Sequence, residues 1–242
     1  KDFYRHCARN DLAVAVAQTD SKGDRSKRPS EQEHPDHYVR IADRNDDGIV
    51  VRGAKVHTSV SVNSNELIVL PTRNLDEREA DYAVAFAVPL NAEGLKMITS
   101  AYTGHHEDSF QFPMGSKHRM LETLTVFDDV FIPWERVFMA GEHQYAGSLA
   151  LRFVDYHRFT AVSYKQPLLD LLVGSAILMS DYNGIAKAGH VRDKLTWLGT
   201  YAQTVKGLLR MAAYHGNTIV PGQMVPNRMY SNVAKWQFAH GY

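Results

Sequence analysis

The sequence lacks several features that would place it in a specialised class of protein. Cysteine occurs once, as Cys7, which excludes a framework of internal disulfides and favours a reducing compartment such as the cytoplasm. The formal net charge at pH 7 is zero, because 27 basic residues balance 27 acidic ones. No overall field would therefore attract nucleic acid or an anionic membrane. No run of about 18 apolar residues occurs, so we expect no membrane-spanning helix.

Two common catalytic signatures are missing as well. The 242 residues contain no GxxxxGK phosphate loop and no nucleophile elbow of the hydrolase type. The chain starts at Lys1 without an initiator Met or a signal peptide, and it stops at Tyr242 directly after a helical pattern. We therefore expect this chain to be a piece of a longer polypeptide.

Two pairs of histidines have the spacing of metal ligands but lack the other ligands. The pairs are His34 with His37 and His105 with His106, and two acidic residues follow the second pair. No cysteine lies beside either pair, and Pro35 separates the members of the first. We expect neither pair to bind a metal.

The most informative stretch is a short apolar run that ends in a polar loop. Residues 13–16 (AVAV) predict a buried strand, and residues 19–25 (TDSKGDR) predict the loop that leaves it. Gly23 lets the backbone approach a ligand closely, and Lys22 and Arg25 supply positive charge. The loop therefore suits a nucleotide-type cofactor, although a solvated connection between strands has the same composition.

The residues from Tyr38 to Phe138 predict a β domain. Expected strands are residues 38–42, 49–56, 66–71, 82–89, 95–100 and 121–127. An Asp-Gly turn joins the first two, and frequent strands separated by turns are typical of an antiparallel β-barrel or sandwich. Residues 127–138 are expected to carry the chain out of the sheet. Small hydroxyl residues gather at positions 58–64, where they could face a cofactor or form an exposed strand face.

After residue 140 the hydrophobic period becomes helical. Residues 149–156, 167–182, 188–214 and 229–238 predict helices, and residues 217–226 predict a loop. The fold class is therefore α+β, with a helical bundle after the β domain. The expected organisation is the end of a helical domain at 1–12, a cofactor-binding β domain at 13–140 and the first part of a helical domain at 141–242.

Several long motifs, in order, carry a resemblance to a known family. They are TDSKGDR (19–25), DDGIVVRGAKVH (46–57), NSNELIVLPT (63–72), DYAVAFAVP (81–89), VFDDVFIPWERVF (126–138), YHR (156–158) and YNG (182–184). Together they resemble the flavoproteins that unite 4-hydroxyphenylacetate 3-hydroxylases with 4-hydroxybutyryl-CoA dehydratases. The resemblance implies an acyl-CoA dehydrogenase-like fold, which places a β domain between two helical domains, and a homotetramer.

The resemblance also implies FAD as the cofactor. The implied FAD contacts are Thr19, Asp20, Ser21, Lys22, Gly23, Asp24 and Arg25, with Ser21 in place of the usual proline. Ser59, which follows the GAK-x-H motif, is implied to lie near the flavin ring. A hydrogen-bond donor is useful there, because a reduced flavin carries negative charge that the protein tunes.

The dehydratase branch of this family also holds an iron–sulfur cluster on three cysteines and one histidine. His157 of the YHR motif matches the ligand histidine. Tyr164 stands where one cysteine ligand is implied, and Ala161 stands in place of a tyrosine. A phenol is a poor ligand for such a cluster. The resemblance at this site therefore argues against an intact iron–sulfur cluster.

Three functional readings follow from the resemblance. The first is a reduced-flavin monooxygenase that hydroxylates a phenolic or related small substrate, takes FADH2 from a separate flavin reductase and uses His157 as a base or orienting residue. The second is a dehydratase-type lyase or isomerase that acts on an acyl-CoA, with Lys165 binding the substrate. The third is a flavin-binding subunit without catalysis.

Overall fold

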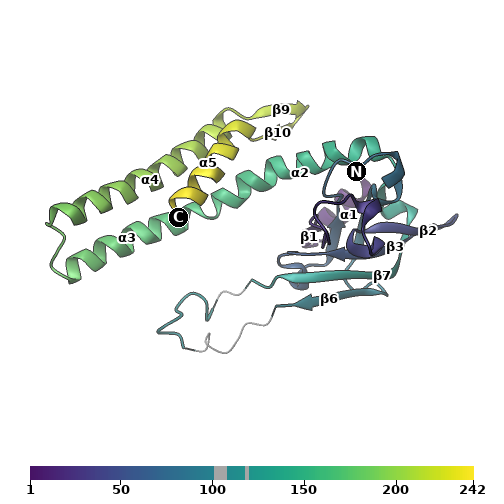
Figure 1. Ribbon diagram of the computed structural model, residues 1–242, viewed down its shortest axis with the longest axis horizontal. Helices are drawn as coiled ribbons and strands as arrows, with labels where there is room; N and C mark the ends of the chain where they lie inside the picture. Colours follow the sequence, from purple (N-terminus) through teal and green to yellow (C-terminus); the bar gives the residue numbers. More distant parts are fainter. Residues whose placement is uncertain (101–107, 118–119) are drawn as a thin grey trace. The chain divides into compact units, whose positions relative to one another are not determined.

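A computed structural model describes residues 1–100, 108–117 and 120–242. The chain divides into two compact units, residues 1–150 and residues 151–242, and each is described by itself. The division falls within helix α2 (His143–Ser163). The expected helix at the start of the chain is α1 (Asp2–Arg9), which is labelled with the other elements in Figure 1.

The first unit contains two four-stranded sheets. One has the order β1-β4-β5-β8 and consists of β1 (Val14–Ala17), β4 (Glu66–Val69), β5 (Val84–Pro89) and β8 (Val137–Ala140). The other has the order β2-β3-β7-β6 and consists of β2 (Arg40–Arg44), β3 (Gly48–Lys55), β7 (Thr123–Pro133) and β6 (Leu95–Thr99). The described strands therefore form two separate sheets and no closed barrel.

The first sheet is mixed, which differs from the expected antiparallel arrangement. Strand β1 pairs with β4 in parallel, with Val14 opposite Glu66, whereas the other ladders of both sheets are antiparallel. The long connection from residue 18 to residue 65 returns the chain in the same direction, as a parallel pair requires. The polar loop at residues 19–25 follows the end of β1.

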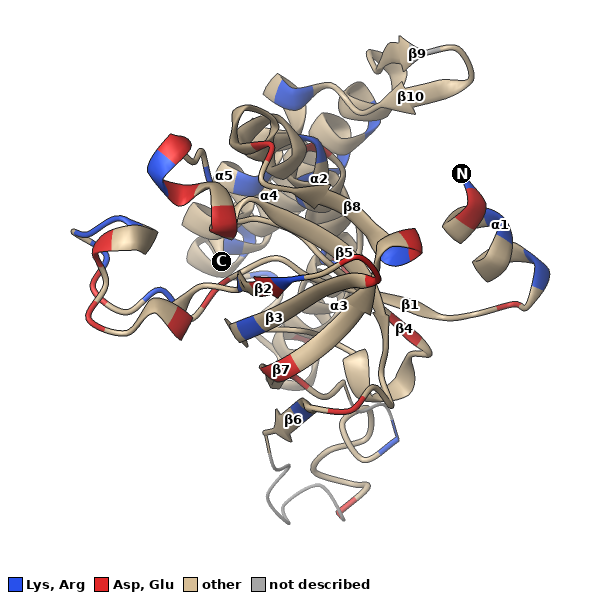
Figure 2. Ribbon diagram, turned by 90° about the vertical axis from the view of Figure 1, so that its right-hand side faces the viewer, with Lys and Arg blue, Asp and Glu red and all other residues tan. Residues whose placement is uncertain are grey.

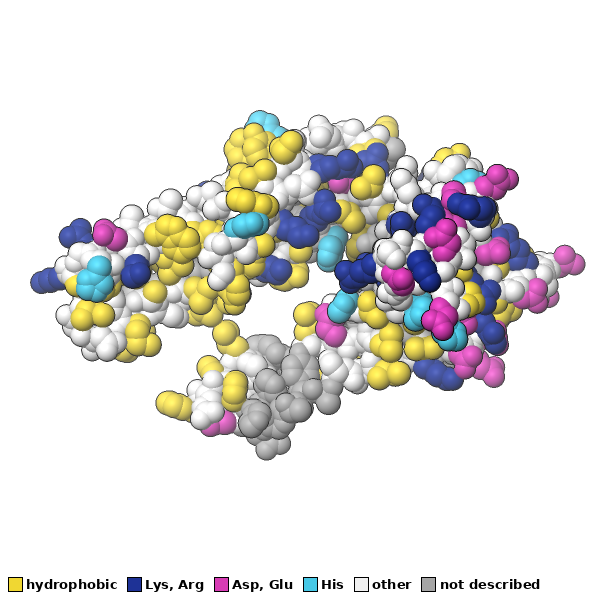
Figure 3. All heavy atoms as spheres, viewed as in Figure 1, with side chains coloured by type: hydrophobic (Ala, Val, Ile, Leu, Met, Phe, Trp, Pro, Cys, Tyr) yellow, Lys and Arg dark blue, Asp and Glu magenta, His cyan; other side chains and the backbone are white. Residues whose placement is uncertain are grey.

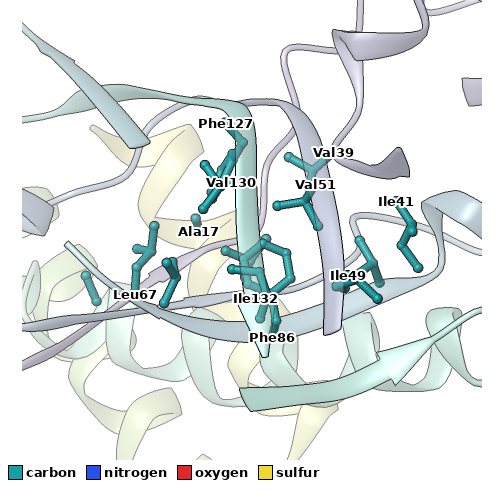
Figure 4. Close-up of a cluster of buried hydrophobic side chains, with 14 residues drawn as sticks. Ala17, Val39, Ile41, Ile49, Val51, Leu67, Phe86, Phe127, Val130 and Ile132 are labelled. Atoms are coloured by element: carbon teal, nitrogen blue, oxygen red, sulfur yellow. The ribbon is translucent and has the colours of Figure 1, made fainter. Parts of the chain in front are cut away.

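Apolar side chains from both sheets form one core, shown in Figure 4. Alternating residues of β3 and β7 contribute Ile49, Val51, Val130 and Ile132, as expected for strands that bury one face. The Phe86 and Phe127 rings meet edge to face at 5.7 Å between centroids, an arrangement that aromatic quadrupoles favour. The core therefore fixes the strands from which the polar loops extend.

Strand β7 corrects the expectation that residues 127–138 leave the sheet. It continues through Asp128 and Asp129 to Pro133, and the chain returns as β8 after a 3-10 turn at Trp134–Arg136. The register against β3 shifts at this point, since Val51 lies opposite Val130 but Gly53 lies opposite Phe127. The two aspartates thus form a bulge within the strand and do not end it.

The second unit is helical. It contains the rest of α2, α3 (Gln166–Tyr182), α4 (Gly189–Tyr214) and α5 (Arg228–Gly241). Residues 217–226, expected to be a loop, contain a hairpin of β9 (Asn217–Val220) and β10 (Gln223–Val225). Its core combines Val162, Leu169, Val205 and Ala234, one from each helix. Among the described residues, no helix combines the length and apolar character that crossing a membrane requires.

Candidate functional site

The loop at residues 19–25 is anchored by a buried ion pair. The Lys55 Nζ atom lies 2.7 Å from the Asp20 Oδ1 atom, and the two residues are 2% and 3% exposed. Lys55 also donates hydrogen bonds to the carbonyl oxygens of Gln18 at 2.8 Å and Leu70 at 2.9 Å. Burial lowers the pKa of Lys55, and the Asp20 carboxylate opposes that shift. The ammonium group therefore ties β3 to the start of the loop and to the end of β4.

The Asp20 carboxylate contacts two further segments. Its Oδ1 atom accepts a hydrogen bond from the Val39 N–H at 3.0 Å, and its Oδ2 atom accepts one from the Thr72 hydroxyl. Both oxygens are thus engaged within the protein. Asp20 links the loop to the residue before β2 and to Thr72 after β4. Its predicted contact with FAD remains a prediction.

Ser21, Gly23 and Asp24 determine the shape of the loop. The Ser21 hydroxyl donates to the His37 carbonyl at 2.7 Å. Gly23 has φ +53°, and a Cβ atom there would lie 2.5 Å from Gln32 Oε1, so the position favours glycine. Hydrogen bonds from Ser26 lower the pKa of Asp24. These contacts fix the backbone of the loop that carries Lys22 and Arg25.

Lys22 and Arg25 line a hollow of about 220 Å³ together with Tyr38, Thr72 and Arg73. We call this feature the cationic hollow. None of its three cations forms an ion pair or a side-chain hydrogen bond with a residue in the described part of the chain. Elsewhere on this unit, cations and acids alternate (Figure 2) and often pair, as Arg52 does with Asp129 at 2.6 Å. Three cations without a partner among the described residues suit an anionic ligand.

Ser59 lies in the turn after β3, beside an acidic residue. Its hydroxyl donates to the Glu122 carboxylate, whose other oxygen lies 3.9 Å from His57 Nδ1. His57 and Val60, which flank this turn, have φ values of 57° and 54°. Such values are uncommon for residues with side chains. The Ser59 hydroxyl and the Glu122 carboxylate therefore lie side by side at this turn.

The hydroxyl residues near Ser59 belong mainly to the interior. Thr58 and Ser61 are fully buried beside Thr123 and Thr125 of β7. The Ser61 and Thr123 hydroxyls lie 2.8 Å apart, and both donate to the Thr58 carbonyl at 3.1 Å. These buried side chains therefore form neither a surface that faces a cofactor nor an exposed face of a strand. They form a satisfied polar network within the unit.

His157 lies on α2, in the helical unit. Its ring stacks on Phe153 at 5.3 Å between centroids with an interplanar angle of 13°. Partial burial lowers the pKa of His157 below 6.5, and the cations of Lys235, Lys165 and Arg158 lower it further. The imidazole is therefore mainly neutral at pH 7, the form that accepts a proton.

The residues that follow His157 lie at the α2–α3 junction. Tyr164 is 62% exposed, and Ala161, one turn after His157, is half-buried. The Lys165 Nζ atom lies 5.3 Å from the centroid of the Phe238 ring of α5, within the range of a cation–π contact. His157 and Lys165 thus belong to one positively charged region of this unit.

Sequence reasoning missed several contacts that matter here. Glu122 and Arg73 carry no motif that could have identified them. The Asp155 carboxylate, which is buried, binds Arg228 through two hydrogen bonds of 2.7 and 2.8 Å and joins α2 to α5. Asp155 lies two residues before His157 on α2, so the two side chains point to different sides of the helix. The sequence does not show that Asp155 pairs with Arg228; the structure does.

The described residues contain no group of three or more metal-ligating side chains. The His34 and His37 rings lie edge to face, with centroids 6.0 Å apart. His105 and His106, the other candidate pair, lie outside the described residues.

Comparison with known proteins first defines the fold class. Butyryl-CoA dehydrogenase from Megasphaera elsdenii matches with a TM-score of 0.68 and 16% identity, over 95% of this chain and 55% of that one. The fold is therefore acyl-CoA dehydrogenase-like. The family model for the N-terminal part of 4-hydroxyphenylacetate 3-hydroxylase matches residues 1–139, and the model for its C-terminal part matches residues 146–242. The chain belongs to the 4-hydroxyphenylacetate 3-hydroxylase family.

Relatives in this family fall into two classes of enzyme. The 4-hydroxybutyryl-CoA dehydratase/vinylacetyl-CoA-Δ-isomerase of Clostridium aminobutyricum is 40% identical over 97% of this chain and 49% of its own length. The oxygenase component of 4-hydroxyphenylacetate 3-monooxygenase from Thermus thermophilus is 29% identical over 94% and 48%. The chain spans about half the length of these relatives.

Solved structures from both classes of enzyme match this chain. A 4-hydroxybutyryl-CoA dehydratase from N. maritimus matches with a TM-score of 0.88 and 34% identity, over 98% of this chain and 48% of that one. An oxygenase component of 4-hydroxyphenylacetate 3-monooxygenase, complexed with FAD, matches with a TM-score of 0.90 and 27% identity, over 100% and 51%. Both classes therefore share the fold of this chain.

Proposed function

We propose that this chain is part of an FAD-dependent enzyme, with residues 19–25 and Ser59 contacting the cofactor. Two cations of the loop, Lys22 and Arg25, line the hollow and fit the negative charge of FAD. The Ser59 hydroxyl donates its proton to Glu122, so it would accept a hydrogen bond from an N–H group of the flavin ring. The FAD complex of the matching oxygenase component supports the same cofactor. When bound, FAD would supply the redox chemistry, and this chain would supply binding and orientation.

The loop contacts can be tested by removing both cations. We expect Lys22→Gln combined with Arg25→Gln to weaken FAD binding to the full-length protein by about 10- to 100-fold, because charge-assisted hydrogen bonds are lost. Lys27→Gln, an exposed loop cation outside the cationic hollow, is the control. Isothermal titration of the apoprotein gives both affinities, and unchanged binding in the double variant would count against the loop as an FAD contact.

The reaction that we propose is reduced-flavin-dependent hydroxylation of a phenolic or related small substrate. The observation that carries this choice is Tyr164, which stands where the resemblance to dehydratases implies a cysteine ligand and whose side chain is exposed. His157, neutral at pH 7, would accept the proton of a phenol or orient the substrate. Monooxygenases among the relatives support this reaction.

A dehydratase-type reaction on an acyl-CoA is the second candidate. The 40% identity to the dehydratase over 97% of the chain favours it. Lys165 and the neighbouring cations would then face the anionic part of the substrate. A flavin-binding subunit without catalysis is the third reading.

One experiment separates these reactions. We expect the full-length protein to bind FAD, to contain no stoichiometric iron or acid-labile sulfide, and to hydroxylate a phenolic substrate when reduced FAD and O2 are supplied. Anaerobic absorption spectra, iron and sulfide assays and product analysis test this expectation. Stoichiometric iron and sulfide, together with conversion of 4-hydroxybutyryl-CoA, would favour the dehydratase. Flavin binding with neither activity would favour the third reading.

The proposed monooxygenase would receive reduced flavin from a separate reductase, because its relatives are oxygenase components. We also propose that it assembles as a homotetramer. Helix α3 supports an assembly, since Leu171, Ile177, Leu178 and Met179 are exposed on it, and Figure 3 shows hydrophobic side chains on the surface of the helical unit. Exposed apolar patches commonly mark interfaces.

A further inference from the structure

We propose that Gln32 is a positioning residue of the candidate cofactor site, because its side-chain amide holds Asp24 and so sets the conformation of residues 23–25. This inference rests on the proposed function, since it names the residue that shapes the loop proposed to contact FAD. Gln32 lies outside that loop and outside the motifs that carry the family resemblance. Its role requires no contact with the ligand.

The Gln32 amide contacts both backbone groups of Asp24. Its Oε1 atom accepts a hydrogen bond from the Asp24 N–H at 2.9 Å, and its Nε2 atom donates one to the Asp24 carbonyl at 2.8 Å. The Nε2 atom also lies 3.3 Å from the carbonyl oxygens of Lys27 and Arg28. A glutamine amide offers one acceptor oxygen and two donor hydrogens, and all of them have partners here. The side chain therefore supplies the pairing that a neighbouring strand would otherwise supply.

The loop needs such a partner, because residues 21–28 contain no helix or strand. Lys22 and Gly23 have φ values of 72° and 53°, and a left-handed conformation at Lys22 is sparsely populated for a residue with a side chain. Such a conformation persists where the surrounding structure imposes it. The Lys22 N–H donates to the His37 carbonyl at 3.2 Å, and Gln32 holds the residue after Gly23. These two contacts fix the backbone on both sides of Gly23.

Gln32 is itself held by the body of the first unit. It directly follows a 3-10 turn at Pro29–Glu31, whose proline is buried. Arg28, which precedes this turn, donates two hydrogen bonds to the fully buried carboxylate of Glu79. This ion pair resists rearrangement, because separating it would leave a buried carboxylate without its cation. The Gln32 amide therefore reaches the loop from a fixed support.

The contact requires an uncharged amide at residue 32. The Asp24 N–H needs an acceptor, whereas the carbonyl oxygens around Nε2 need a donor, so a carboxylate would satisfy only the N–H. Its negative charge would also face those carbonyl oxygens. A protonated carboxyl group regains one donor, and an unperturbed glutamate titrates near about pH 4.3. The variant Gln32→Glu thus makes the donor dependent on pH.

The test is isothermal titration of the full-length apoprotein with FAD at about pH 7.5 and about pH 5, on either side of which the added carboxylate differs in protonation. We expect Gln32→Glu to bind FAD about tenfold more weakly than the wild type at the higher pH. At the lower pH the difference should shrink to about fourfold or less, because acid restores part of the donor. Ser30→Glu adds the same charge at an exposed position nearby and should change the affinity by less than about twofold at both pH values. A loss in Gln32→Glu that is equal at both pH values would contradict the donor role of Gln32.

A second variant reports on the loop without a ligand. Gln32→Ala removes every contact of the amide, so hydrogen exchange of the Asp24 N–H in the apoprotein should become at least about tenfold faster, and FAD binding should weaken about tenfold. FAD affinities of both Gln32 variants within about twofold of the wild type would overturn the inference and leave the proposed function intact. A wild type that binds no FAD would overturn the proposed function. The exchange rate of the Asp24 N–H would then decide whether Gln32 shapes the loop, and an unchanged rate would refute it.

Discussion

Replacing Lys55 by Met is expected to destabilise the full-length protein by about 3–5 kcal/mol. The substitution preserves most of the side-chain volume but leaves the Asp20 carboxylate buried without its cation. It also removes two hydrogen bonds, to the Gln18 and Leu70 carbonyls. Chemical denaturation in urea measures the change in the free energy of unfolding, and the thermal midpoint should fall in parallel.

Two comparisons make this prediction specific to the buried pair. The double variant Lys55→Met with Asp20→Asn removes both charges, so it should recover part of the lost stability. Arg52→Gln breaks the exposed ion pair between Arg52 of β3 and Asp129 of β7. This variant should lose no more than about 1 kcal/mol of unfolding free energy. A loss below 1 kcal/mol for Lys55→Met would show that the pair does not hold the loop.

The loop itself was predictable from the sequence, but its anchoring was not. The apolar run at 13–16 and the polar residues at 19–25 predicted a strand followed by a loop, and the structure has β1 and that loop. The pairing of Asp20 with Lys55 joins residues 35 positions apart. Hydrophobic periodicity reports which face of a strand is buried, but it does not report which distant charges meet.

Strand β7 shows a second limit of sequence reasoning. Asp128 and Asp129 are typical turn residues, so the strand was expected to end before them. In the structure Asp129 has φ 54° and binds Arg52 through two hydrogen bonds of 2.6 Å. A cross-strand ion pair thus holds a bulge that local composition interprets as a turn. The β9–β10 hairpin was missed because strands of three and four residues give too short a pattern to detect.

The helices were better predicted, because their apolar stripes are long. The expected helix at 188–214 corresponds to α4 at Gly189–Tyr214, and the expected start at a proline corresponds to α3. Arg73, in contrast, lies after β4 in a segment with no periodic pattern. Only the tertiary structure places Arg73 beside residues 22 and 25.

Replacing His157 by Gln is expected to lower the kcat of the proposed hydroxylation by roughly 100- to 10,000-fold, the range that a general base contributes. Glutamine can still donate and accept hydrogen bonds, but it cannot take up a proton at neutral pH. FAD affinity should not change, because the cofactor residues proposed above lie in the other unit. Steady-state kinetics with a phenolic substrate, alongside FAD titration, separate the two effects.

The pH dependence gives the decisive test of this role. The pKa of His157 is lowered below 6.5, so the neutral base is present at pH 7 and is lost as the pH falls through that lowered pKa. The acid limb of the kcat/KM profile should therefore lie below pH 6.5 in the wild type and vanish in His157→Gln. Lys235→Gln removes a cation that disfavours the imidazolium, so the limb should move to higher pH.

A matched histidine variant guards against a general effect of substitution in the helical unit. His190 is exposed at the start of α4, and His190→Gln should leave kcat and the acid limb unchanged. If His157→Gln retained wild-type kcat within threefold and kept the acid limb, another group would have to accept the proton. Such a result would direct attention to Glu122, the carboxylate beside Ser59, because it is the acidic side chain that contacts a predicted flavin-facing residue.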